Sequence, residues 1–185
     1  MAAGNMTDEQ KTLYFNLIWA NEFAYREQEF YINELLAIPN RTPAQEADLQ
    51  ARYQAQNQTR AYIIKTAAYI KANSDIKNIK KAAQFLTRTN WFPPRITEMQ
   101  GKIDQNEAEW QQYLIDREKR RVEIEEWILQ MNPPQADIDA AWADWNNVYT
   151  ASYYWYQRYQ TIYTWNRDLL IQLQSADKSV WDDIL

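Results

Sequence analysis

The side chains that could carry chemistry in this chain are mainly carboxylates, and they gather in three clusters. Carboxylates that converge in a cleft bind Mg²⁺ or Ca²⁺, or serve as the acid and base of a glycosidase. The clusters are Glu123/Glu125/Glu126, Asp137/Asp139/Asp144 and Asp177/Asp182/Asp183. We expect them at helix starts and on solvated helix faces, where the helix dipole and solubility account for acidic residues. The sequence therefore predicts no metal site.

The residue types on which most enzymes depend are missing. The 185 residues include no histidine and no cysteine, which removes the usual base near neutral pH, the thiol nucleophile and the commonest metal ligands. The only glycines are Gly4 and Gly101, so a glycine-rich phosphate loop cannot form. We expect a protein that is not an enzyme and that uses no cofactor.

Basic residues concentrate in the middle of the chain. Residues 60–102 carry nine lysines and arginines against only Asp75 and Glu98, although the whole chain has a net charge of −5. Lysine and arginine bind phosphates without sequence preference, and an aromatic ring beside them could stack on a base. The candidate contacts with nucleic acid or an acidic partner are Lys71, Lys77, Lys80, Lys81, Arg88 and Trp91.

Residues 152–165 (SYYWYQRYQTIYTW) are dense in aromatic rings, and their spacing predicts a packed helix face. Positions that alternate by four and three residues form a heptad seam, and a flanking stripe at spacing seven widens it. The seam is Ile138, Trp142, Trp145, Tyr149, Ser152, Tyr156, Tyr159, Tyr163, Asn166, Leu170 and Leu173, and the stripe is Ala141, Val148, Trp155, Ile162 and Leu169. Most of these rings are expected in a core.

A few aromatic residues fall outside this pattern. Tyr153 lies just beside the seam, where boundary packing is expected. Tyr154 and Trp165, with Arg158 between them, share one face opposite the seam. Tyrosine, tryptophan and arginine are enriched in protein interfaces, so this face predicts contact with another protein. Surface exposure, or burial against another helix of the same chain, are the alternatives.

Both ends of the chain also suggest partners. Residues 13–25 (LYFNLIWANEFAY) are apolar on nearly every side, which predicts a central helix or one covered by another subunit. The acidic tail contributes Trp181, Ile184 and Leu185, an apolar and acidic sequence that fits a docking peptide or, alternatively, a frayed terminus.

The elements that position these groups are predicted to be long helices. The prolines fall at three places, Pro39/Pro43, Pro93/Pro94 and Pro133/Pro134, and each pair predicts a helix break. Helix-start signals stand at four positions. Thr7 and Thr42 each begin a capping box, and Ser74 and Asn132 are expected as further N-caps.

The predicted fold is all-α: an elongated bundle of long antiparallel helices within a single domain, 1–185. It comprises a hairpin over 8–72, a short basic helix over 75–90, a hairpin over 97–174 and an acidic tail over 175–185. Within the second hairpin, Arg117 and Arg121 occupy seam positions that apolar residues would otherwise fill. Charged seam residues reduce stability but specify register and partner.

These observations favour a non-enzymatic structural or assembly subunit that self-associates within a larger complex, because the separated charges attract one another between copies. The composition suits a virion component, such as a bacteriophage capsid, neck or tail accessory protein. An adaptor or regulator that binds nucleic acid or an acidic partner through residues 60–102 is the alternative. The amino terminus lacks a signal-peptide pattern and no segment is apolar enough to span a bilayer, so we expect a soluble protein, cytoplasmic or in a virion.

Overall fold

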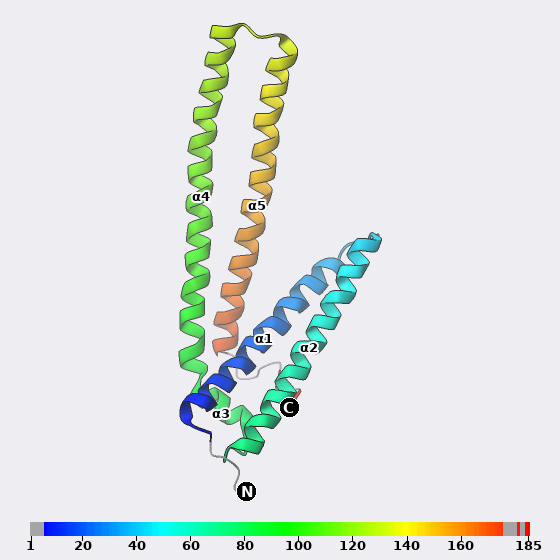
Figure 1. Ribbon diagram of the computed structural model, residues 1–185, viewed down its shortest axis with the longest axis vertical. Helices are drawn as coiled ribbons and strands as arrows, with labels where there is room; N and C mark the ends of the chain where they lie inside the picture. The colour runs from blue at the N-terminus through cyan, green and yellow to red at the C-terminus, as the bar shows by residue number, and fades with distance from the viewer. Residues whose placement is uncertain (1–5, 176–180, 182–183) are drawn as a thin grey trace. The chain divides into compact units, whose positions relative to one another are not determined.

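The computed structural model describes residues 6–175, 181 and 184–185, and its elements are all helices (Figure 1). They are α1 (Asp8–Leu36), α2 (Pro43–Asn73), α3 (Ile79–Leu86), α4 (Arg88–Met131) and α5 (Gln135–Ser175). No strand occurs in the described residues, so the all-α prediction is confirmed. The chain divides into two compact units: Met1–Ile96 together with Asp168–Leu185, and Thr97–Arg167.

The first two helices begin as their sequences predict. Thr7 Oγ1 accepts a hydrogen bond from the Gln10 amide (3.2 Å), and Gln10 Oε1 accepts one from the Thr7 amide (2.9 Å). Thr42 and Gln45 repeat this capping box at α2, with Pro43 in the first turn, where its missing N–H has no intrahelical partner to lose.

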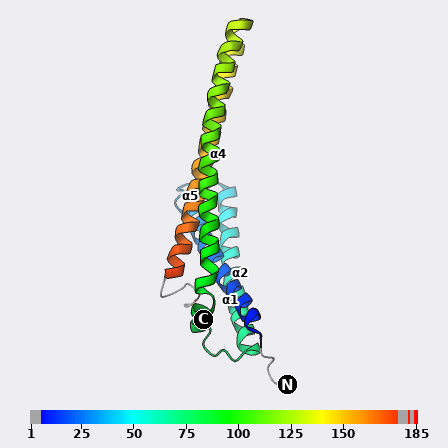
Figure 2. The ribbon, with the colours of Figure 1, turned by 90° about the vertical axis from the view of Figure 1, so that its left-hand side faces the viewer.

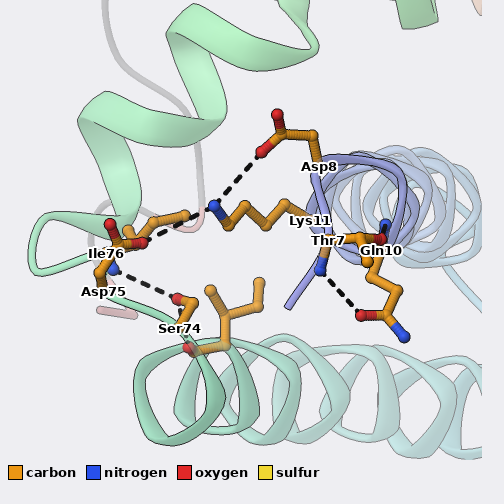
Figure 3. A network of polar contacts seen from close by, with 8 residues as sticks. Thr7, Asp8, Gln10, Lys11, Ser74, Asp75 and Ile76 are labelled. Carbon is orange, nitrogen blue, oxygen red and sulfur yellow. Dashed lines mark hydrogen bonds and ion pairs between the residues drawn. The ribbon is translucent and has the colours of Figure 1, made fainter. Parts of the chain in front are cut away.

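In the first unit, α1 and α2 form an antiparallel hairpin (Figure 1). Phe15 and Ile18 of α1 and Ile63 and Ile70 of α2 are fully buried. The end of α2 is also tied to the start of α1: Lys11 Nζ lies 3.3 Å from Asp8 Oδ1 and 3.7 Å from Asp75 Oδ1 (Figure 3). The Lys11–Asp75 pair links the two helices at the open end of the hairpin, while the Lys11–Asp8 pair lies within α1.

Trp19 of α1 is at the centre of the remaining core of this unit. Its indole Nε1 donates to Thr87 Oγ1 at 2.7 Å, and both side chains are buried. Its ring meets those of Phe92 and Trp181 edge-on, at centroid distances of 5.2 and 5.7 Å. Aromatic residues from three distant parts of the sequence therefore share one core.

Several helix boundaries differ from the prediction. Helix α3 covers 79–86 rather than 75–90, with Asn78 as its N-cap, while Ser74 closes α2 instead of opening a helix. Asn132 likewise ends α4 instead of capping α5, because its φ of 42° is left-handed, a conformation that asparagine tolerates better than most residues.

The proline pair at 93–94 lies inside α4, so the predicted break there is wrong. Both prolines fall in the early turns of the helix. The carbonyls of Thr89 and Asn90, which lose their usual amide donors, belong to exposed residues that water can reach. Burial of Phe92 beside Trp19 further holds this part of α4 in place.

In the second unit, residues 97–131 of α4 and 135–167 of α5 form a two-helix antiparallel hairpin, seen edge-on in Figure 2 with α4 in front of α5. In a two-helix hairpin, each helix is covered by the other on one face only. What the outer faces carry therefore decides what this unit can bind.

Candidate functional site

The seam between α4 and α5 in the second unit is built around Trp110. Its ring stacks on that of Tyr156, with centroids 4.9 Å apart and planes 12° from parallel. It also lies 5.8 Å from the ring of Tyr149 and 5.6 Å from that of Tyr153. Tyr153 is thus a boundary residue, as predicted, and the aromatic side chains of the seam form the packing of this hairpin.

A polar cluster lies next to this stack. The Tyr156 hydroxyl donates a hydrogen bond to Glu107, and Gln111 Nε2 donates to the same carboxylate at 2.9 Å. The hydrogen bond from Tyr156, followed by that from Gln111, lowers the pKa of Glu107, and the bond to Glu107 raises the pKa of Tyr156. The pair connects α4 to α5 by a charge-assisted bond.

Arg117 takes the predicted charged position in the seam. Its guanidinium carbon lies 3.3 Å from the ring centroid of Trp145 and 4.4 Å from that of Tyr149. The Trp145 indole in turn donates to the Arg117 carbonyl at 3.1 Å. Stacking on two rings compensates in part for placing a charge between the helices. Its Nε is buried and has no hydrogen-bond partner among the described residues.

A cavity of about 300 Å³ opens beside Arg117. Its lining combines apolar and aromatic groups with charges of both signs: Tyr113, Asp116, Arg117, Arg120, Ile124, Ala141, Asp144, Trp145 and Val148. The cavity therefore offers a bound group apolar surface beside charges of both signs.

Large rings of α5 stay partly exposed along one edge of its seam with α4. Trp155, expected in the packed stripe, is 53% exposed, and the expected seam residue Tyr159 is exposed as well. Trp155 stacks on Tyr159 and Tyr159 stacks on Tyr163, each pair with centroids 5.8 Å apart. We call these three residues the aromatic ladder. The prediction of burial is wrong for Trp155 and Tyr159 because only one helix packs against this part of α5.

The outer face of α4 carries a second apolar stripe, which the sequence analysis missed. Ile115, Val122 and Leu129 are exposed and stand seven residues apart, so they lie along one line on the helix. We call them the outer stripe. The seven-residue spacing could have predicted this stripe from the sequence, but the sequence analysis considered only the seam through Trp110.

The three residues of the predicted interface on α5 differ in exposure. Tyr154 is exposed and meets Trp155 edge-on, with centroids 5.3 Å apart. Arg158 and Trp165 are half-buried, and both already interact within the chain. Of the three, Tyr154 is the residue open to a partner, and it adjoins the aromatic ladder.

The predicted docking residues of the tail are placed differently from one another. Trp181 is fully buried against Trp19, which corrects the expectation that it is offered to a partner: the chain's own core uses it. Ile184 is half-buried and Leu185 is exposed. The aspartates between Trp181 and Ile184 lie outside the described residues.

Some of the residues that were predicted to contact nucleic acid or an acidic partner are buried or already bonded within the chain. Trp91 is buried and packs against Phe92, so it cannot stack on a base, and Arg88 Nε is bound to the Gln174 carbonyl at 2.5 Å. Lys80 is half-buried and interacts within the chain. The exposed members are Lys71, Lys77 and Lys81.

Neither a metal cluster nor a membrane-spanning helix emerges from the part of the chain that is described. No three acidic side chains there lie close enough to hold an ion, and no helix is both long and apolar enough to cross a bilayer. Comparisons with protein-family models, curated proteins and solved structures find no match to this chain.

Proposed function

We propose that this protein is a non-enzymatic assembly subunit that binds other protein subunits through the outer surface of its α4–α5 hairpin. The observation that carries this proposal is the aromatic ladder, in which Trp155 and Tyr159 are exposed and Tyr163 is half-buried. Single exposed apolar residues are ordinary, whereas stacked, contiguous rings on one face are typical of protein-binding surfaces. Tyrosine and tryptophan also lose little side-chain entropy when they are covered.

The construction of the second unit supports the same conclusion. A two-helix hairpin is marginal alone, because each helix buries only one stripe. Here the seam also contains Arg117 and the Glu107–Tyr156 pair, so part of its length is polar. Another subunit packed over the ladder would supply the missing apolar contacts.

The composition suits a structural component of a virion, such as a bacteriophage capsid, neck or tail accessory protein. An adaptor that binds nucleic acid through residues 60–102 is the second candidate. The exposed lysines Lys71, Lys77 and Lys81 favour it. The burial of Trp91 weighs against it, because stacking on bases is lost.

The test is the mass in solution, measured by light scattering at low and high salt. We expect a multimer that resists salt, since the ladder is apolar and aromatic, and a lower mass for Trp155→Ala/Tyr159→Ala with unchanged helix content. The matched control is Tyr53→Ala, an exposed ring on α2. If Trp155→Ala/Tyr159→Ala has the same mass in solution as the wild-type protein, the role given to these rings is contradicted.

Salt-sensitive binding to arbitrary DNA or RNA, lost on Lys77→Glu/Lys81→Glu, would instead favour the nucleic-acid adaptor.

A further inference from the structure

The outer stripe of α4 lies opposite the seam with α5. At 100° per residue, Ile115, Val122 and Leu129 fall within about 20° of one line, while Ile124 and Tyr113 face the other way. Beside the stripe is an open groove of about 460 Å³, lined by Gln111, Leu114, Ile115, Glu118, Lys119 and Val122. The hairpin partner α5 cannot reach this face of α4.

The charges along the two edges of the stripe are arranged differently. On one edge, Arg121 lies 2.6 Å from both Glu118 and Glu125, so these carboxylates are compensated within the helix. On the other edge stand Lys119 and Glu126, seven residues apart, and neither makes an ion pair with any described residue.

This pattern is self-complementary: the outer stripe of a second copy, running antiparallel, matches it in apolar residues and in charge. If two copies pack antiparallel with Val122 against Val122, Ile115 of each copy meets Leu129 of the other. Corresponding edges face each other in an antiparallel pair, so Lys119 of each copy meets Glu126 of the other. Two ion pairs and a continuous apolar stripe result from one two-fold operation.

We propose that a second copy of this chain binds the outer stripe of α4, antiparallel and centred on Val122. The inference rests on the proposed assembly function and names one of its partners. The aromatic ladder on α5 takes no part in this pairing and stays available to a further subunit. The commonest symmetry of soluble oligomers is the two-fold that this register requires.

The first test uses the absence of cysteine from the natural chain. With Val122→Cys, the two thiols face each other across the two-fold axis, and we expect a disulfide-linked dimer under mild oxidation. Leu129→Cys is the matched control: it is 84% exposed against 40% for Val122, so random collision would cross-link it faster. In the proposed register it meets Ile115 instead, and we expect little cross-linking. Faster linking of Leu129→Cys would overturn the register.

The second test exchanges charges. Lys119→Glu or Glu126→Lys replaces two attractive pairs by two repulsive ones, which should weaken dimerisation about tenfold at low salt. The double variant Lys119→Glu/Glu126→Lys restores both pairs and should recover the affinity. Each variant is read by sedimentation alongside circular dichroism. Additive weakening in the double variant would contradict the pairing.

The outcomes separate the two proposals. Suppose that the wild-type protein is a multimer, that Val122→Cys forms no disulfide-linked dimer and that the charge exchanges leave the affinity unchanged. This result would overturn the α4 interface and leave the assembly function standing. A wild-type chain that stays monomeric at high concentration would sink the α4 interface and self-assembly together.

Discussion

Glu107 and Tyr156 join the two long helices through a pair of titratable side chains, which makes the contact sensitive to acid. Because the bond lowers the pKa of Glu107, its contribution to stability is present above the unfolded-state pKa and is lost as pH falls through the lower folded-state value. We expect stability to decline below about pH 4, and Glu107→Gln to reduce that decline in thermal unfolding followed by circular dichroism.

The matched control for this residue is Glu109→Gln. Glu109 lies on the same helix and accepts from Gln105 at 2.9 Å, within α4 and without reaching α5. It should keep the acid sensitivity of the natural protein. If Glu107→Gln and Glu109→Gln respond alike to acid, the bond to Tyr156 does not account for the effect.

At the scale of the elements, the turn between α4 and α5 depends on the conformation of Asn132. Its φ of 42° favours asparagine or glycine over residues with an ordinary side chain. Asn132→Ala should destabilise the protein by about 1 kcal/mol, and Asn132→Gly should cost clearly less. Denaturant unfolding of the two variants measures the difference. Equal stability of the two would show that the left-handed conformation is not maintained in solution.

At the scale of the whole molecule, the two units differ in how completely they bury their helices. Trp19, Phe15 and Ile63 are fully buried in the first unit, whereas the second leaves Trp155 and Leu129 exposed. A subunit bound to those faces stabilises the folded state by mass action. We therefore expect the melting temperature to rise with protein concentration.

This dependence should weaken when Trp155→Ala/Tyr159→Ala is introduced and also, independently, with Lys119→Glu. Calorimetry over a hundredfold range of concentration provides the measurement. A melting temperature that stays constant over that range would be incompatible with self-assembly.

Local chemistry was sufficient to predict much of this structure. The capping boxes at Thr7 and Thr42 and the helix ends beside them depend on residues only three or four positions apart, and they are confirmed. The heptad seam of α5 likewise follows from spacing, and Tyr159 is its one exposed position. The prediction of a helix break at residues 93–94 was wrong because a proline pair breaks the interior of a helix, whereas the early turns of a helix at the surface tolerate it.

Burial of individual rings depended on contacts that spacing does not encode. Trp181 packs against Trp19, far away in the sequence, while Trp155 lies open. A heptad pattern marks which stripes of a helix are apolar, but the number of helices that pack against it depends on the tertiary fold. The sequence therefore established long helices and their seams. Only the tertiary structure decided which apolar faces are left for a partner, since one neighbouring helix covers one face.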